Sequence, residues 1–511
     1  MISLHSLKKG VVAGIFSSVW LAVLSLFLSP KYLSYLGLEC YALIGLYTTG
    51  LAIGGILDFA FSSNVTRELA GMNVSRRNQL AAQNFFYGIE FLYWFCIIVL
   101  GLFLFALILV FGSSWLVSAT ISENKASSIL ILIILSLVIQ VPVGLYSSVL
   151  IGFRKQFDSA VTLAFFGTFR GVIVLLSISM FKASISDFFI LYIAINLLQM
   201  LWMRKVAWSL LRVSNTKLTF PKTLIARIKH SVNSMFFISC AGVAISQFDK
   251  IILAFIVPLE SLGYYVLAWS FSSSLTILSS PIAQGFGARF SALEALGKAS
   301  EFKKFVVLVF QFTSAIVIPP TLLIAFFSQL IMTGWISDLA IAKISSPILC
   351  LLSIGTGSIA CVYPLLFAIY AKQDFKMVLK IQIIAFGLSF PFFIFMAIKL
   401  GVLGAAISWA IYGIALLCVY IAKISTRCGG HIFLKMISSF ISISLVCALI
   451  DLIAKIALLK MSSSVNLTGY SIYFLLSLVL MVSWTASFLM IKNLRDYAFN
   501  QIKQIKSLRF L

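Results

Sequence analysis

The sequence predicts an all-α membrane protein of about fourteen transmembrane helices, arranged as two pseudo-symmetric six-helix lobes followed by a C-terminal helix pair. Three observations predict it: the composition, the length of the apolar runs, and the alternation of charge between the loops. Of the 511 residues, 61% are hydrophobic and only 10% are charged, whereas about 25% of a typical soluble domain is charged. A water-soluble fold could not cover so much apolar surface, so the bilayer must be the main solvent.

Fourteen runs are long and apolar enough to cross a bilayer, which takes about 20 residues of helix. The first follows Lys8 and Lys9. It is longer than the core of a signal peptide and no small-residue cleavage site follows it, so we interpret it as a membrane helix. The predicted spans are 10–29, 38–63, 84–111, 129–151, 160–180, 186–203, 231–257, 261–285, 305–327, 344–371, 378–398, 402–422, 434–454 and 470–491.

The distribution of Lys and Arg predicts the orientation of these spans. If the N-terminus is placed in the cytoplasm, the inside segments hold 29 Lys and Arg residues and the outside segments hold 7. Cytoplasmic loops of membrane proteins carry such an excess. We therefore expect a multi-pass protein of a bacterial inner membrane with both termini in the cytoplasm. The net charge of +23 follows from these loops, and we expect no nucleic-acid partner.

The longest predicted loop divides the chain into domains. We expect an N-lobe at 1–203 with spans 1–6, a basic cytoplasmic linker at 204–230, a C-lobe at 231–422 with spans 7–12, and a segment 423–511 with the last two spans and a cytoplasmic tail. The predicted outside loops are all short, which disfavours enzymes that need a folded extracytoplasmic domain. The eight cysteines form no CxxC motif and the three histidines are scattered, so no metal site or other cofactor is expected.

The two six-helix blocks resemble each other weakly. Glu39 precedes an apolar helix that ends near Arg67, 28 residues later, and Glu260 precedes one that ends near Arg289, 29 residues later. Parallel repeats of this kind place a substrate path between two lobes. The alternative is that Glu and Arg simply mark the two membrane interfaces.

Several stretches carry a family resemblance. They are YLGLECYALIGLYTTGLAIGGILDFAFSSNVTRELAG (35–71), NSMFFISCAGVAISQFDKIILAFIVPLESLGYYVLAW (233–269), PIAQGFGARFSAL (281–293), YPLLFAIYAKQDFK (363–376) and LGVLGAAISWAIYG (400–413). Together they resemble polysaccharide flippases of the Wzx type, which export O-antigen and capsule units. Those proteins belong to the superfamily that also includes the MATE multidrug exporters.

The resemblance implies two lobes around a cation-lined cavity, with transport by alternating access and no enzymatic reaction. The implied cargo is an undecaprenyl-pyrophosphate-linked oligosaccharide, which would move from the cytoplasmic to the periplasmic leaflet. The implied energy source is a gradient of H⁺ or Na⁺. Expected partners are the lipid-linked oligosaccharide and membrane lipids, with a polysaccharide polymerase and a chain-length regulator as further candidates.

Ionisable residues within the spans are candidate site residues, because a charge near the bilayer centre costs about 2.5–3.5 kcal/mol on insertion scales. Arg170 lies about halfway along the span 160–180. Its planar guanidinium suits a phosphate, which it can bind through two parallel hydrogen bonds. Gly167 and Gly171 are expected to leave room beside it. The alternative is a structural salt bridge that holds helices together.

The span 231–257 carries a polar stripe. Asn233 and Gln247 fall near one line on a helix and Lys250 lies about 60° from it, as expected for the wall of a cavity that binds substrate. Alternatively, Lys250 extends to the outer surface. Asp249 precedes Lys250 and points about 100° away, so these two side chains need not pair.

Two carboxyl groups, of Asp58 and Asp249, are candidate carriers of the coupling ion, because a carboxyl group removed from water takes up a proton more readily. The alternative for Asp58 is an ion pair with Arg67 in its own lobe. Arg67 and Arg289 either attract a pyrophosphate to the cytoplasmic mouth or act as ordinary interfacial anchors.

Other polar or helix-breaking residues also fall within the spans. Glu90 and Asp451 are expected at membrane interfaces. Pro142, with Gln140 nearby, and the pair 319–320 are predicted to kink their helices, either as hinges or as static bends.

Two other functions would require residues or loops that a flippase does not need. A MATE-like multidrug exporter would need an acid-rich pocket for cationic drugs, whereas the deepest charge here is that of Arg170, which favours an anionic cargo. A membrane polymerase would be expected to show a sizeable outer loop with catalytic residues, and no such loop is predicted.

Overall fold

The computed structural model describes residues 4–72, 79–115, 121–211, 246–336, 338–428, 431–462 and 469–491. Within these ranges the regular secondary structure is helical and no strand occurs. Twelve of the helices are long and apolar enough to cross a membrane. The predicted fold class, an all-α membrane protein, is confirmed.

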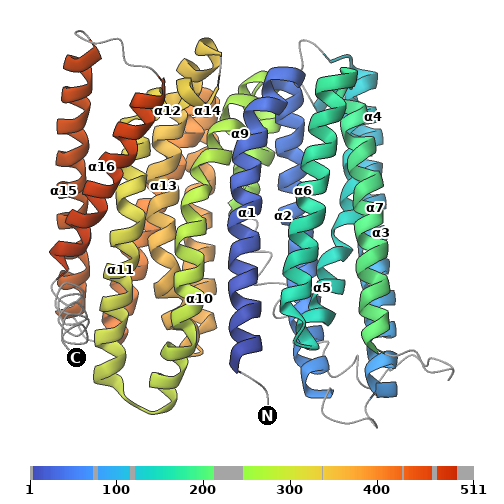
Figure 1. Ribbon diagram of the computed structural model, residues 1–511, viewed down its shortest axis with the longest axis horizontal. Coiled ribbons are helices and arrows are strands. Elements are labelled where there is room, and N and C mark those ends of the chain that lie inside the picture. The colour runs from blue at the N-terminus through green and yellow to red at the C-terminus, as the bar shows by residue number, and fades with distance from the viewer. Residues whose placement is uncertain are drawn as a thin grey trace, which may run out of the picture. The chain divides into compact units, whose positions relative to one another are not determined.

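The chain divides into two compact units, Met1–Val266 and Leu267–Leu511, and the division falls within helix α9. In each unit the helices lie side by side with roughly parallel axes (Figure 1). The first unit contains α1 (Leu4–Leu36), α2 (Leu38–Met72), α3 (Gln79–Trp115), α4 (Glu123–Gln140), α5 (Pro142–Gly152), α6 (Gln156–Phe181), α7 (Ile185–Leu211) and the start of α9 (Leu259–Ser272). The second contains α10 (Ser274–Ala295), α11 (Ala299–Phe326), α12 (Ser328–Trp335), α13 (Leu339–Ala371), α14 (Phe375–Cys428), α15 (His431–Ser462) and α16 (Gly469–Met490).

The predicted linker 204–230 is described only in part. Its first eight residues, 204–211, extend helix α7, and the rest of the linker lies outside the described residues. The predicted domain boundaries therefore stay a prediction.

The predicted fourth span, 129–151, is a broken helix. Helix α4 ends at Gln140 and α5 begins at Pro142, because proline has no N–H to donate and its ring crowds the preceding turn. By contrast, Pro319 and Pro320 lie inside α11, which continues through them.

Helix α14 holds two predicted spans. Its 54 residues would extend about 80 Å as one straight helix, more than twice the hydrocarbon thickness of about 30 Å. At Gly401 the backbone takes φ 59° and ψ −138°, a conformation that glycine adopts because it has no Cβ. Helix α14 is therefore two limbs, 375–400 and 402–428. The predicted span 231–257 is described only from residue 246, and it is helical over 246–256.

Close contacts between helices use glycine, as expected where lipid removes the hydrophobic drive for helices to associate. Gly413 of α14 lies so close to Gly355 of α13 that a Cβ at either position would overlap the opposite backbone. In the first unit, α2, α3, α5 and α7 share a buried core that includes Phe85, Phe86 and Tyr146.

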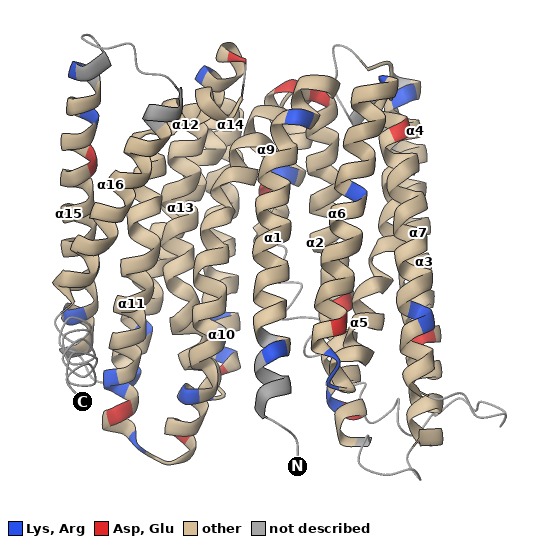
Figure 2. Cartoon of the chain, viewed as in Figure 1, with Lys and Arg blue, Asp and Glu red and all other residues tan. Residues whose placement is uncertain are grey.

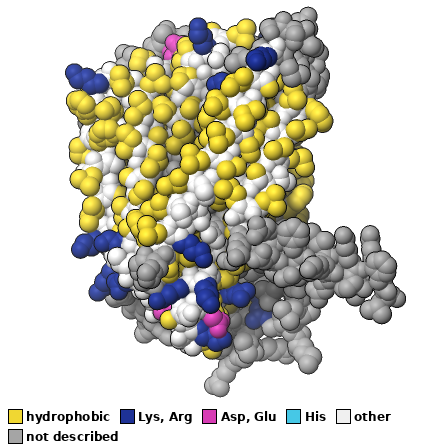
Figure 3. Space-filling view, turned by 90° about the vertical axis from the view of Figure 1, so that its left-hand side faces the viewer, with side chains coloured by type: hydrophobic (Ala, Val, Ile, Leu, Met, Phe, Trp, Pro, Cys, Tyr) yellow, Lys and Arg dark blue, Asp and Glu magenta, His cyan; other side chains and the backbone are white. Residues whose placement is uncertain are grey.

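The surface fits a bilayer. Large apolar side chains such as Phe91, Phe181 and Leu388 are 59%, 79% and 74% exposed, which would be unfavourable in water. Figure 3 shows a broad hydrophobic band with Lys and Arg gathered beyond its two edges. In Figure 2 most charged residues of each unit lie toward the helix ends. The chain is therefore a multi-pass membrane protein.

Candidate functional site

Arg170 lies on α6 and is held by two side chains of α7. Its Nη1 donates a 2.7 Å hydrogen bond to Oδ1 of Asn196, and its guanidinium lies over the ring of Tyr192, 5.0 Å from the centroid. A guanidinium has five N–H donors, and this hydrogen bond uses one of them. The Arg170 side chain is half-buried.

Asn196 connects Arg170 to two further helices. Its Nδ2 donates to the hydroxyl of Tyr47 on α2 at 3.2 Å and to Oγ of Ser136 on α4 at 3.0 Å. Asn196 and Ser136 have no exposed surface. The amide thus presents its oxygen to the cation and uses both N–H groups, so α2, α4, α6 and α7 meet in one polar cluster.

The charge of Arg170 has no carboxylate beside it. Among the described residues, no Asp or Glu lies within ion-pair distance of its guanidinium. The predicted alternative, a structural salt bridge, therefore has no support in this part of the chain. A cation within a span that keeps free donors and lacks a carboxylate is suited to binding an anion.

The prediction that Gly167 and Gly171 leave room beside Arg170 was wrong. Both glycines face α1, where Leu21 and Leu28 occupy the space that a Cβ would need. The glycines serve instead the close packing of α6 against α1, in which the hydroxyl of Tyr32 also donates to the carbonyl of Gly171 at 3.2 Å.

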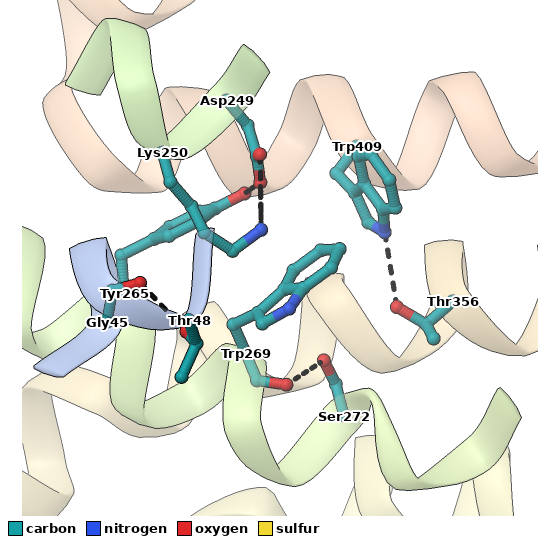
Figure 4. A network of polar contacts seen from close by, with 9 residues as sticks. All are labelled: Gly45, Thr48, Asp249, Lys250, Tyr265, Trp269, Ser272, Thr356 and Trp409. Atoms are coloured by element: carbon teal, nitrogen blue, oxygen red, sulfur yellow. Dashed lines mark hydrogen bonds and ion pairs between the residues drawn. The ribbon is translucent and has the colours of Figure 1, made fainter. Parts of the chain in front are cut away.

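A second polar cluster is formed by residues close to the C-terminal end of the first unit (Figure 4). Lys250 Nζ lies 3.2 Å from Oδ1 of Asp249 and 3.3 Å from Oδ2. The hydroxyl of Tyr265 on α9 donates to Oδ2 at 2.7 Å. Asp249 and Tyr265 have no exposed surface and Lys250 is 2% exposed.

The expectation that Asp249 and Lys250 diverge was wrong. Helical geometry separates their Cα–Cβ directions by about 100°, but the flexible lysine side chain folds back to the carboxylate. Burial explains why, because an ammonium removed from water is stabilised by a charged partner. Lys250 therefore does not extend to the surface, and its charge is balanced in this conformation.

Helix α2 lies beside both clusters in the first unit. Tyr47 belongs to the Arg170 cluster, and two residues earlier Gly45 lies against Val266, the residue after Tyr265. Figure 4 shows Gly45 and Thr48, joined by a hydrogen bond of 2.8 Å, near Tyr265. A shift of α2 would therefore act on both clusters.

In the second unit, Figure 4 shows a separate aromatic pair. The rings of Trp269 and Trp409 meet edge to face with centroids 4.8 Å apart. The indole of Trp409 donates to Thr356 Oγ1 at 3.1 Å, and Ser272 donates to the carbonyl of Trp269 at 3.2 Å. These contacts join α9, α13 and α14.

Asp58 is on α2 and lies beside the break between α4 and α5. Its Oδ1 accepts from Ser62 at 2.6 Å and from the hydroxyl of Tyr93 at 3.5 Å, and Gly144 leaves space for the carboxylate. Tyr93 also lies 3.3 Å from the carbonyl of Val141, at the helix break. The predicted alternative partner, Arg67, is not among the contacts of Asp58.

The other predicted site residues are scattered. Arg67, near the end of α2, donates to Asn64 at 2.9 Å and lies 3.9 Å from Glu68. Arg289, near the end of α10, is exposed and covers the ring of Phe305 at 4.7 Å. The roles of Arg67 and Arg289 stay a prediction. Gln247 is half-buried, and Asn233 lies outside the described residues.

Glu39 and Glu260, which suggested the internal repeat, both fall in the first turn of a helix. An acidic residue there is favoured by the helix dipole. Their place at helix starts therefore needs no internal repeat to explain it, and the alternative that they mark membrane interfaces stays open.

Two acidic residues that were expected at interfaces are buried. Glu90 accepts from Arg204 and Tyr146, each at 2.7 Å, and from Trp208 at 3.1 Å. Asp451 on α15 has no exposed surface, and neither oxygen has a hydrogen-bond partner among the described residues. Burial against other helices does not fix the depth of a side chain in the membrane, so the interfacial position of both residues stays a prediction.

Sequence reasoning missed Asn196, Tyr47, Ser136 and Tyr265. A signal existed for Asn196, because an amide in the middle of an apolar span needs hydrogen-bond partners there. Hydroxyl-bearing residues are common in these helices, so sequence alone gave no means to choose Ser136 or the two tyrosines.

No protein-family model and no curated protein sequence matches this chain. Solved structures do match the chain. The lipid II flippase MurJ in an inward closed conformation has a TM-score of 0.73 at 15% identity, covering 94% of this chain and 99% of MurJ. An inward-facing MATE multidrug-resistance transporter of the MOP superfamily gives 0.59 at 14%, covering 80% and 94%. The Vibrio cholerae MATE transporter VcmN gives 0.59 at 13%, covering 84% and 98%.

The chain shares the fold of these flippase and transporter structures. Identities this low show the fold alone, so any statement about the cargo must come from the residues of this chain. The fold is the one that the sequence resemblance implied, whereas the flippase type is a matter for proposal.

Proposed function

We propose that this protein is a transporter, not an enzyme, and that it flips an undecaprenyl-pyrophosphate-linked oligosaccharide such as an O-antigen or capsule repeat unit. It works by alternating access in a bacterial inner membrane, from the cytoplasmic to the periplasmic leaflet, with both termini in the cytoplasm. The observation that carries the proposal is Arg170. Its charge lies within a span and has no carboxylate partner among the described residues.

A pyrophosphate that leaves water needs a compensating positive charge. At a separation of 4 Å and an effective dielectric of about 20, one such pair is worth about 4 kcal/mol. The guanidinium adds two parallel hydrogen bonds to this attraction. Asn196 and Tyr192 hold it in place and leave the remaining N–H donors for a phosphate.

In this proposal the buried pair of Asp249 and Lys250 couples transport to an ion gradient. Protonation of Asp249 would release the ammonium of Lys250, which then adds a second positive charge to the substrate path. Asp58 is a second candidate carrier of H⁺ or Na⁺. The further residues proposed for the substrate path are Gln247, Asn233, Arg67 and Arg289.

The test is export in a strain that lacks the chromosomal gene and carries Arg170 variants. Arg170→Ala should lower surface polysaccharide on the order of 100-fold, equivalent to about 3 kcal/mol, with lipid-linked oligosaccharide accumulating inside. Arg170→Lys should retain part of the activity, because an ammonium keeps the charge but loses the fork geometry.

Arg154→Gln is the matched control, since it removes an exposed cation of the same unit near the end of α5. It should export normally. Normal export by Arg170→Ala at wild-type protein levels would refute the proposed role of Arg170.

A MATE-like exporter of cationic drugs is the second candidate, and the carboxylates of Asp58 and Asp249 favour it. The deletion strain separates the two functions. Accumulation of lipid-linked oligosaccharide supports the flippase, whereas increased drug sensitivity with unchanged oligosaccharide supports the exporter.

A further inference from the structure

A groove of about 760 Å³ lies between the two limbs of α14, wholly within the second unit. Residues at the start of the first limb and the end of the second line one end of it, such as Met377 and Thr426. Phe392 and Ser408, which approach the break at Gly401 from either side, line the other end. The two limbs are therefore antiparallel, and both ends of α14 lie at the same end of the groove.

The walls of the groove are apolar and open to the surroundings. Ile384, Leu388, Ile411 and Val419 line it and are 52%, 74%, 49% and 41% exposed. All four lie within a helix that crosses the membrane. Side chains so exposed on a membrane-crossing helix present an apolar surface to lipid.

The two serines on these walls do not call for a polar ligand. Ser389 donates to the carbonyl of Phe386 at 3.3 Å, and Ser408 donates to that of Gly404 at 2.9 Å. Each hydroxyl proton is used by the backbone of its own limb. The walls therefore present a surface suited to an acyl chain.

The mouth of the groove is strongly basic. Lys376 and Lys380 lie one turn apart on the first limb, and Lys423 and Arg427 lie one turn apart on the second. The only acidic residue among those lining the groove, Asp374, is 2.8 Å from Arg427 and pairs with it across the limbs. No carboxylate of the described chain lies within ion-pair distance of the three lysines.

We propose that this groove binds a glycerophospholipid with an anionic headgroup, one acyl chain lying along the apolar walls and the phosphate on the lysines of the mouth. A neutral lipid would leave the cations of the mouth unused. A soluble anion would leave the exposed apolar walls unused. An anionic glycerophospholipid, which joins hydrocarbon to a charged headgroup, matches both parts. The proposal is independent of the cargo proposed above, because none of these residues belongs to the polar clusters of the first unit.

The experiment is native mass spectrometry of the purified full-length protein with phosphatidylglycerol and phosphatidylcholine of identical acyl chains. The wild type should retain phosphatidylglycerol at least about tenfold better than phosphatidylcholine. Each lysine near an anionic lipid is worth about a fivefold factor. The double variant Lys376→Gln/Lys380→Gln should therefore retain phosphatidylglycerol more than about tenfold less well than the wild type. Ala415→Trp, which fills the groove, should weaken the binding of both lipids.

Lys303→Gln/Lys304→Gln is the matched control, because it removes the same two charges from the start of α11 in the same unit. It should bind phosphatidylglycerol like the wild type. Equal retention of the two lipids by the wild type, or an equal loss in the control, would overturn the proposal and leave the lysines as orientation signals. Displacement of phosphatidylglycerol by millimolar inorganic phosphate would also overturn it, in favour of a soluble anion.

Discussion

Replacing Asp249 by Asn tests whether the buried pair with Lys250 is held together by charge. Asparagine has nearly the same shape and keeps an oxygen that can accept the hydrogen bond from Tyr265, now 2.7 Å long. The substitution therefore removes the negative charge and little else.

The structure sets the expected cost. The ammonium lies 3.2 Å from the carboxylate, and the two side chains are 3% and 0% exposed. Removing one partner of a buried ion pair typically costs about 3–5 kcal/mol, because the other charge stays in a medium of low dielectric. For a unit the size of Met1–Val266, this loss of unfolding free energy corresponds to a fall of roughly 6–10 °C in the melting temperature.

The double variant Asp249→Asn/Lys250→Met is the control that completes the cycle. Methionine fills much of the volume of lysine without its charge, so most of the lost stability should return. The assay is the fraction of monodisperse protein left after heating in detergent, measured for the wild type, both single variants and the double variant. A single Asp249→Asn variant as stable as the wild type would refute the reasoning, as would a double variant no more stable than that single one.

The same double variant tests the proposed coupling role. If Asp249 carries the ion, the folded double variant should transport without responding to an imposed gradient. Full gradient-dependent transport by the folded double variant would remove Asp249 from the mechanism and leave the pair as a structural feature.

Two further predictions concern orientation and the second carboxylate. A membrane-impermeant thiol reagent added outside should label Ser122→Cys and not Ser214→Cys in a background without accessible native cysteines; labelling at 214 contradicts the proposed orientation. Asp58→Asn should weaken gradient-driven transport while the protein still inserts and folds, because Ser62 and Tyr93 can still donate to the amide oxygen. Unchanged gradient dependence in a reconstituted transport assay would exclude Asp58 as an ion carrier.

The sequence by itself determined the fold class, the break at Pro142 and every span except 231–257, which is described only from residue 246. These features depend on local properties of the chain. Twenty apolar residues in a row exclude a soluble helix surface. Proline lacks the N–H that continues a helix, although α11 continues through Pro319 and Pro320. The mid-span position of Arg170 could be predicted for the same reason, because finding it requires only counting residues along the chain.

The tertiary structure decided which polar groups meet. Nothing in the sequence brings Asn196 to Arg170 and Tyr47, because three different helices must pack before those side chains touch. The folding back of Lys250 onto Asp249 overrode the angle expected from helical geometry, because burial makes an unpaired charge costly and a long side chain can rotate to avoid it. The basic groove of α14 likewise exists only because the chain reverses at Gly401, which brings lysines almost fifty residues apart in sequence to one mouth.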